Sequence, residues 1–180
     1  GGAQILNKHA IALMQNYCMR VSRIRHVHAT GRKYYAMIKG AYPALARGSG
    51  GCIVHPFIED MSTYMKAADV VICRSGAMTL AELAMIGKPA ILIPSPNVTD
   101  DHQYKNAKVL LDAGAAALFE EKELETTEAA PLTEKVAYLL SEQGAAERRA
   151  MEEKIRAFAV PDANKRIYLD LLDLVKNKKK

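Results

Sequence analysis

Residues 68–94 read ADVVICRSGAMTLAELAMIGKPAILIP and place one helix pattern between two strand patterns. The apolar runs at residues 70–73 and 90–93 do not alternate with polar residues, which is typical of strands that are covered on both faces. Residues 77–86 have helical spacing, and Gly87 is a typical residue for the end of such a helix. A strand, a helix and a second strand in this order predict two parallel strands joined by a crossover helix.

The same alternation continues on both sides of this stretch. We predict further strands at residues 25–29, 52–55 and 116–119. We predict further helices at residues 5–17, 34–46, 61–67, 101–112, 132–141, 145–159 and 163–175, with polar loops at residues 47–51 and 95–99. This order indicates an α/β fold, a Rossmann-like parallel sheet with helices on both faces. We expect one domain over residues 1–160, followed by a C-terminal helix and basic tail over residues 161–180.

Composition limits the class of protein. The chain has 180 residues, is 49% apolar and 25% charged, and carries a net charge of +5, which is ordinary for a globular protein. Its three cysteines are scattered and form no metal-binding spacing, so we interpret them as reduced thiols of a cytoplasmic protein. The basic tail, Lys176 and residues 178–180, is either a solvated helix end or a contact with an anionic membrane surface. No aromatic residues are interleaved with the basic ones, which argues against nucleic acid as a partner.

In a parallel α/β sheet, ligands bind where loops leave the carboxyl ends of the strands. The segment RSGAMTLAE, residues 74–82, occupies such a position. Ser75 is a suitable N-cap, Gly76 allows a ligand close to the backbone, and the free N–H groups of a helix start favour a phosphate. Ser75, Thr79 and Glu82 share one helix face, where Glu82 could accept hydrogen bonds from a ribose diol. The alternative is a capped helix with an exposed glutamate.

A second candidate segment, NVTDDHQYKN, spans residues 97–106. Gln103 and Asn106 lie on one helix face, and their amides both donate and accept hydrogen bonds, as sugar hydroxyls do. The alternative is structural, with Asp100 as N-cap and Gln103 as its capping-box partner. Asp100, Asp101 and His102 are adjacent residues that should point in different directions, so we expect no metal site and no cofactor.

Other glycines, histidines and strand ends give weaker signals. Gly1 and Gly2 fit a turn that cradles a diphosphate. The backbone of Ile58 could meet a flat base, although core packing is the simpler interpretation. His26 and His28 lie on a predicted strand and are expected to be packed or hydrogen-bonded.

Taken together, these segments resemble the C-terminal domain of the MurG family, UDP-N-acetylglucosamine transferases that act on a muramoyl-peptide carried by undecaprenyl diphosphate. The resemblance spans almost the whole chain. It rests on residues 68–94 and on the motifs GGAQILN (residues 1–7), HATG (28–31), PFIEDM (56–61), DDHQYKNA (100–107) and DAGAA (112–116). It implies one half of a two-domain GT-B glycosyltransferase.

The resemblance also implies roles for individual residues. The backbone of Ile58 would read uracil, and Glu82 would hold the ribose hydroxyls. Met78 and Thr79 would contact the phosphates and neighbouring groups, beside the helix start predicted at Ser75 and Gly76 and the turn predicted at Gly2. Gln103 and Asn106 would hold the N-acetylglucosamine hydroxyls, with His102 beside them.

The chain also departs from the family pattern. The family's first glycine turn reads GGSxGA, whereas this chain has only Gly1, Gly2 and Ala3 at that place. The family's N-terminal domain, which supplies the lipid I pocket and the general base, has no counterpart in these residues, so we assign no catalytic residue. The expected function is therefore donor binding for inverting transfer of GlcNAc from UDP-GlcNAc to lipid I in peptidoglycan synthesis, at the inner face of the cell membrane, with the fragment itself inactive. Two alternatives stay open: a donor domain of another GT-B glycolipid or split glycosyltransferase, and a non-catalytic nucleotide-binding module.

Overall fold

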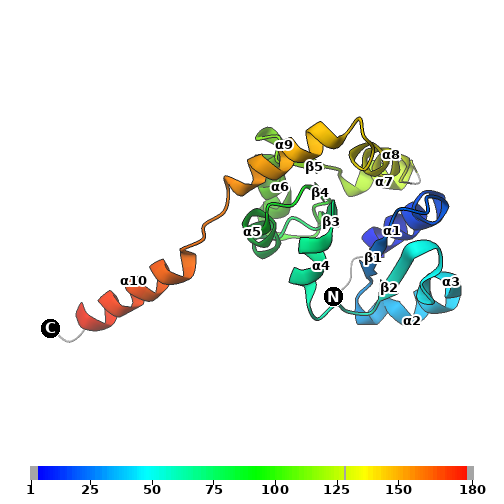
Figure 1. The fold of residues 1–180 in the computed structure, drawn as a ribbon. Coiled ribbons are helices and arrows are strands. Elements are labelled where there is room, and N and C mark those ends of the chain that lie inside the picture. Colours follow the sequence, from blue (N-terminus) through cyan, green and yellow to red (C-terminus); the bar gives the residue numbers. More distant parts are fainter. Residues whose placement is uncertain (1–3, 128, 178–180) are drawn as a thin grey trace.

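The computed structural model describes residues 4–127 and 129–177, and it shows an α/β body from which one helix extends (Figure 1). All of its strands run parallel within their sheets. The strands are β1 (His26–Ala29), β2 (Cys52–His55), β3 (Val71–Cys73), β4 (Ala90–Leu92) and β5 (Ala116–Leu118). The α-helices are α1 (Gln4–Asn16), α2 (Arg32–Ala41), α3 (Pro43–Ala46), α4 (Met61–Ala67), α5 (Ala77–Ile86), α6 (His102–Asp112), α7 (Glu121–Thr126), α8 (Ala130–Leu139), α9 (Ala145–Arg156) and α10 (Ala163–Asn177).

The strands form two sheets where we expected one. Strands β3, β4 and β5 form the larger sheet in that order, with Ile72 opposite Ile91 and Ile91 opposite Ala117. Strands β1 and β2 form a separate pair, with His28 opposite Val54. The predicted α/β class with parallel strands is confirmed, but its sheet is divided between β2 and β3.

One apolar core crosses this division. Buried residues of β2 (Cys52 and Val54) belong to the same cluster as Ile91 of β4 and Ile93, which directly follows that strand. Helices α1 and α8 contribute Leu13 and Leu139, both of which are almost fully buried. The two sheets are therefore held together by side-chain packing, because burial of apolar surface does not require hydrogen bonds between strands.

The sequence patterns placed most elements correctly, with two local errors. The helix predicted over residues 34–46 is broken at Tyr42, because Pro43 disfavours helical backbone in the preceding residue and starts a new helix, α3. Helix α7 was not predicted. It is six residues long and lacks apolar periodicity, but a capping box between Glu120 and Glu123 supports its start. Gly87 adopts φ 64° and ends α5 as expected.

Helix α10 extends away from the body after residues 160–162 (Figure 1). One side of it carries Ile167, Leu171 and Leu174, which are 58%, 56% and 62% exposed. Among the described helices, none is both long and apolar enough to cross a membrane.

Candidate functional site

The carboxyl ends of β3 and β4 bring the two candidate segments into contact. We call this region the strand-end site and define it as residues 74–82, Ser95 and residues 102–106. Ser75 Oγ donates a hydrogen bond to the backbone oxygen of Gln103 at 2.7 Å. Asn106 Nδ2 donates to the backbone oxygen of Ser75 at 3.3 Å. The turns after two neighbouring parallel strands are therefore joined directly, as the general rule for such sheets predicts.

Ser75 has a different role from the one we expected. The N-cap of α5 is Gly76, which has extended backbone and no side-chain cap, so the prediction of Ser75 as N-cap is wrong. The Ser75 side chain is fully buried and directed to the second segment instead. Because no side chain occupies the capping position, the first N–H groups of α5 remain available to an anion.

Gly76 leaves this helix start open. A Cβ atom built on Gly76 would meet no heavy atom of the described residues within 4 Å. Its φ of −68° is accessible to any residue, so conformational freedom does not explain a glycine here. The glycine instead keeps the space in front of the helix start free of side-chain atoms. That space is where a ligand would approach the N–H groups.

Helix α5 presents the other predicted residues of the first segment. Thr79 and Glu82 lie three residues apart and so share a face of α5, with Thr79 partly buried and Glu82 exposed. The side chain of Met78 is 77% exposed. Burial of the Cys73 thiol, with the nearby Glu82 carboxylate as a second cause, raises the pKa of Cys73 to about 12. Cys73 is therefore a neutral thiol beside the site.

Gln103 organises the second segment. Its Oε1 accepts a hydrogen bond from the backbone N–H of Ser95 at 2.9 Å, across the turn that follows β4. Asp100 does not cap α6. Asp100 and Asp101 both have φ 53°, and Asp101 occupies the N-cap position without a side-chain cap. The capping-box alternative for Gln103 is therefore wrong, because its side chain faces the β4 turn.

The amides of Gln103 and Asn106 keep hydrogen-bonding capacity beyond these contacts. In these contacts the side-chain oxygen of Gln103 accepts one hydrogen bond and the side-chain nitrogen of Asn106 donates one. Both side chains are partly exposed. An amide carries both donors and an acceptor, so one group on each residue can still serve a polar ligand. His102 is exposed beside them, and its Nδ1–H donates to the backbone oxygen of Thr99 at 2.9 Å. Among the described residues, His, Cys, Asp and Glu side chains form no cluster that would hold a metal ion.

Arg74 was not singled out from the sequence, although it lies next to Ser75. Its guanidinium donates to the backbone oxygens of Ile93 and Pro94 at 2.9 and 3.0 Å, and it forms an ion pair with Glu121 of α7. Arg74 therefore ties the ends of β3 and β4 to α7. The signal that could have revealed it is a charged residue directly after a buried strand, where only a paired charge is tolerated.

The remaining predicted residues lie at or outside the edge of this region. Ile58 follows β2 and is 7% exposed, so its side chain belongs to the interior, as the packing interpretation predicted. The role of its backbone toward a base stays a prediction. Gly2 lies outside the described residues.

A polar network explains the HATG motif. His28 Nε2–H donates to Asn7 Oδ1 at 2.8 Å, and Asn7 Nδ2 donates to the backbone oxygen of Thr30 at 3.0 Å. These bonds attach α1 to the end of β1, where Gly31 precedes α2. Burial lowers the pKa of His28 to about 4, and burial together with the nearby His28 lowers the pKa of His26 to about 3. Both rings are therefore neutral at pH 7, in agreement with the structural role that we expected.

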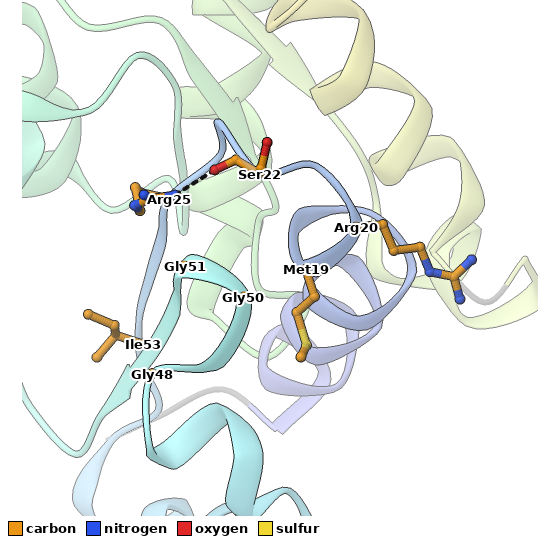
Figure 2. A pocket seen from close by; sticks show the side chains of 8 residues that line it. All are labelled: Met19, Arg20, Ser22, Arg25, Gly48, Gly50, Gly51 and Ile53. Carbon is orange, nitrogen blue, oxygen red and sulfur yellow. Dashed lines mark hydrogen bonds between the residues drawn. The ribbon is translucent and has the colours of Figure 1, made fainter.

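One cavity adjoins the strand-end site, and another lies beside the β1–β2 pair. A cavity of about 220 Å³ adjoins the strand-end site and is lined by Ser95, Asp101 and Glu121 among others. A larger one of about 590 Å³ lies at the opposite end of the β1–β2 pair, beside Gly50 and Gly51 (Figure 2). There Arg25 Nη1 donates to the backbone oxygen of Ser22, while the Arg20 side chain points away from the glycine turn. Because Arg25 is bound to backbone oxygens and Arg20 points away, the greater size of this cavity does not by itself mark it as the functional site.

Parallel strands, crossover helices and candidate binding groups at the carboxyl strand ends define the chain as a Rossmann-like α/β domain. Residues 1–167 match the family described as "Glycosyltransferase family 28 C-terminal domain". The chain therefore belongs to glycosyltransferase family 28 and corresponds to the C-terminal domain of that family.

Several relatives agree with this assignment. The chain is 39% identical over 169 residues to a UDP-N-acetylglucosamine–N-acetylmuramyl-(pentapeptide) pyrophosphoryl-undecaprenol N-acetylglucosamine transferase of Shewanella amazonensis, with 92% of this chain and 44% of that protein covered. It is 42% identical over 142 residues to the protein of the same name from Burkholderia orbicola, with 78% and 37% covered. The chain thus spans less than half the length of these relatives.

Solved structures show the same fold. The crystal structure of Acinetobacter baumannii MurG matches with a TM-score of 0.73 and 29% identity, covering 98% of this chain and 47% of that one. The spinosyn rhamnosyltransferase SpnG, in complex with spinosyn aglycone, matches with a TM-score of 0.61 and 18% identity, covering 91% and 40%. The second likeness concerns the fold alone.

Proposed function

We propose that this chain is the UDP-GlcNAc-binding half of an inverting glycosyltransferase that transfers GlcNAc to the muramoyl-peptide of lipid I. The contact between Ser75 and Gln103 carries the proposal, because it places an open helix start beside two amide side chains. The relatives whose names specify this reaction support the choice of donor and acceptor.

The proposed chemistry uses this half of the enzyme for orientation and charge stabilisation. The 4-hydroxyl of the muramoyl sugar attacks the anomeric carbon of the donor, and the bond from that carbon to the diphosphate oxygen breaks with inversion. The N–H groups at the start of α5 stabilise the negative charge on the departing UDP. Glu82 accepts hydrogen bonds from the ribose, the Ile58 backbone contacts uracil, and Gln103 and Asn106 orient the sugar. The general base and the lipid pocket belong to the acceptor half.

Helix α10 is proposed to join the two halves. The apolar stripe of Ile167, Leu171 and Leu174 recurs at helical spacing and stays exposed on the body described here. In the whole protein, we propose that this stripe packs against the acceptor half, at the inner face of the cell membrane. Residues 161–180 then form a connecting segment separate from the donor-binding domain of residues 1–160.

Calorimetric titration of the chain with UDP-GlcNAc, UDP-GalNAc, UDP and NADH tests the donor assignment. We expect saturable binding of UDP and UDP-GlcNAc and none of NADH. Glu82→Gln should weaken UDP binding by about 10- to 100-fold, since hydrogen bonds to a charged group contribute roughly 1.5–3 kcal/mol. Glu134→Gln, at an exposed position on α8, is the matched control and should bind normally.

The same experiment separates the alternatives. Stronger binding of another UDP-sugar would indicate a different GT-B transferase. UDP binding that survives Glu82→Gln unchanged would indicate a nucleotide-binding module that does not use this face. Turnover of lipid I by the chain alone would contradict the assignment of the general base to the other half.

A further inference from the structure

Charge is divided unevenly along the chain. Residues 1–58 contain eight Lys and Arg and no Asp or Glu, whereas residues 59–180 contain 17 Lys and Arg against 20 Asp and Glu. The net positive charge of the protein therefore comes from its first third. The structure gathers α1, β1, α2, α3 and β2 on one side of the molecule, away from α5, α6 and α9 (Figure 1). We call residues 4–58 the basic lobe.

The charges of the basic lobe face solvent. Within the described residues, none of the five ion pairs includes a basic side chain of this lobe. All eight basic residues are exposed: Lys8, Arg20, Arg23, Arg25, Arg32, Lys33, Lys39 and Arg47. Their potentials therefore add, because the lobe itself contains no Asp or Glu. The net charge of residues 59–180 is negative, so the molecule is electrically asymmetric and orients in the field of a charged surface.

Helix α2 carries three of the eight basic residues of this lobe. Its inner side carries Ile38, which is 2% exposed and belongs to the core. Its outer side carries Arg32, Lys33 and Lys39 around the small residues Ala36 and Gly40, all of them exposed. We call this outer side, together with Met37, the α2 face.

Met37 adds an apolar component. Its side chain is 60% exposed and lies one turn after Lys33 on α2. Met37 therefore places one apolar side chain beside the basic ones, and such a side chain can enter the headgroup region of a membrane to which the basic residues bind.

We propose that the α2 face binds the surface of an anionic phospholipid membrane, with its basic side chains on the phosphate groups and Met37 at the headgroup boundary. The small residues Ala36 and Gly40 let the helix backbone lie close to the surface. The proposal adds a membrane contact within the donor half and rests on the proposed function only in that a lipid-linked acceptor brings the enzyme to a membrane. It differs from a contact made by the basic tail.

Vesicle flotation tests the proposal directly. The chain is mixed with vesicles of phosphatidylglycerol and phosphatidylcholine or of phosphatidylcholine alone, at 0.1 and 0.5 M NaCl. We expect binding to the anionic vesicles that is weaker at high salt, because screening shortens electrostatic reach. The triple variant Arg32→Gln, Lys33→Gln, Lys39→Gln should lose on the order of 100-fold in vesicle affinity, since each basic residue near such a surface is worth about a factor of five.

A second triple variant controls for net charge. Lys66→Gln, Arg149→Gln, Lys165→Gln removes the same charge from exposed positions outside the basic lobe and should bind vesicles like the wild type. Met37→Ser should weaken vesicle binding without changing the charge. Titration of each variant with UDP reports on the strand-end site separately, so failure of this proposal is distinguishable from failure of the proposed function.

Three outcomes would overturn the proposal. The first is equal loss of vesicle binding in both triple variants, which would mean that only total charge matters. The second is absence of binding to anionic vesicles at 0.1 M NaCl. The third is binding to a single-stranded RNA oligonucleotide that exceeds vesicle binding and depends on the α2 face, which would assign the face to nucleic acid.

Discussion

Ser75 Oγ donates a hydrogen bond to the backbone oxygen of Gln103, across 2.7 Å and between two segments 28 residues apart in the chain. The Ser75 side chain is completely buried, so this bond forms away from competing water. It places the open start of α5 against the first turn of α6. The relative position of the groups assigned to phosphate and sugar therefore depends on a contact that neither segment specifies alone.

Gly76→Ala should leave stability nearly unchanged but reduce UDP affinity by about tenfold or more. The added methyl group meets no protein atom within 4 Å and strains no backbone angle. It occupies the approach to the helix-start N–H groups, where one charge-assisted hydrogen bond is worth roughly 1.5–3 kcal/mol. Thermal unfolding and calorimetric titration with UDP measure the two effects. Unaltered UDP affinity would show that the diphosphate does not bind at this helix start.

Two substitutions at Gln103 should separate its structural role from its binding role. Gln103→Glu retains an oxygen for the Ser95 N–H, so we expect a stability loss below about 0.5 kcal/mol. Gln103→Leu removes that acceptor and should cost about 1 kcal/mol. Both variants lose the amide donor, and both should weaken UDP-GlcNAc binding by about tenfold. Urea unfolding and titration check this, and a Gln103→Glu variant that binds like the wild type would remove Gln103 from the sugar site.

Arg74→Met should destabilise the fold by about 1–3 kcal/mol. The substitution breaks the ion pair with Glu121 and leaves the backbone oxygens of Ile93 and Pro94 without their partner. Arg166→Met is the matched control, since Arg166 pairs with Asp162 on an exposed helix start and such pairs contribute about 0.5 kcal/mol or less. Equal urea midpoints for the two variants would contradict the bridging role of Arg74.

Stability should decrease as the pH falls below about 6.5. The pKa values of His28 and His26 are lowered in the folded state to about 4 and about 3 from 6.5, so the unfolded chain binds more protons in this range. Their contribution to stability is complete above pH 6.5 and is lost as the pH falls toward the folded values. Each histidine gives a slope of up to about 1.4 kcal/mol per pH unit.

Urea unfolding at several pH values between 7.5 and 4.5 measures this slope. His28→Gln keeps an N–H donor for Asn7 but has no titrating group, so the variant should show a visibly smaller slope than the wild type. An unchanged slope would show that acid instability has another source.

The sequence by itself determined the local elements and the class of fold. Uninterrupted apolar runs such as residues 90–93 reveal strands that are buried on both faces, and Gly87 marks a helix end. The signals are readable because periodicity and turn chemistry depend on neighbouring residues. For the same reason the two candidate segments could be found one at a time, each with a structural alternative beside it.

Tertiary structure alone decided how these pieces meet. Three contacts join residues that are distant in the chain or belong to different elements. They are the hydrogen bond from buried Ser75 to Gln103, the hydrogen bond from the Ser95 N–H to the Gln103 side chain, and the ion pair of Arg74 with Glu121 of α7. A polar side chain such as Ser75 can cap its own helix or bond to a neighbour at similar energy. Which of these it does depends on whether packing removes it from water and brings a partner within reach, and that is a property of the folded chain.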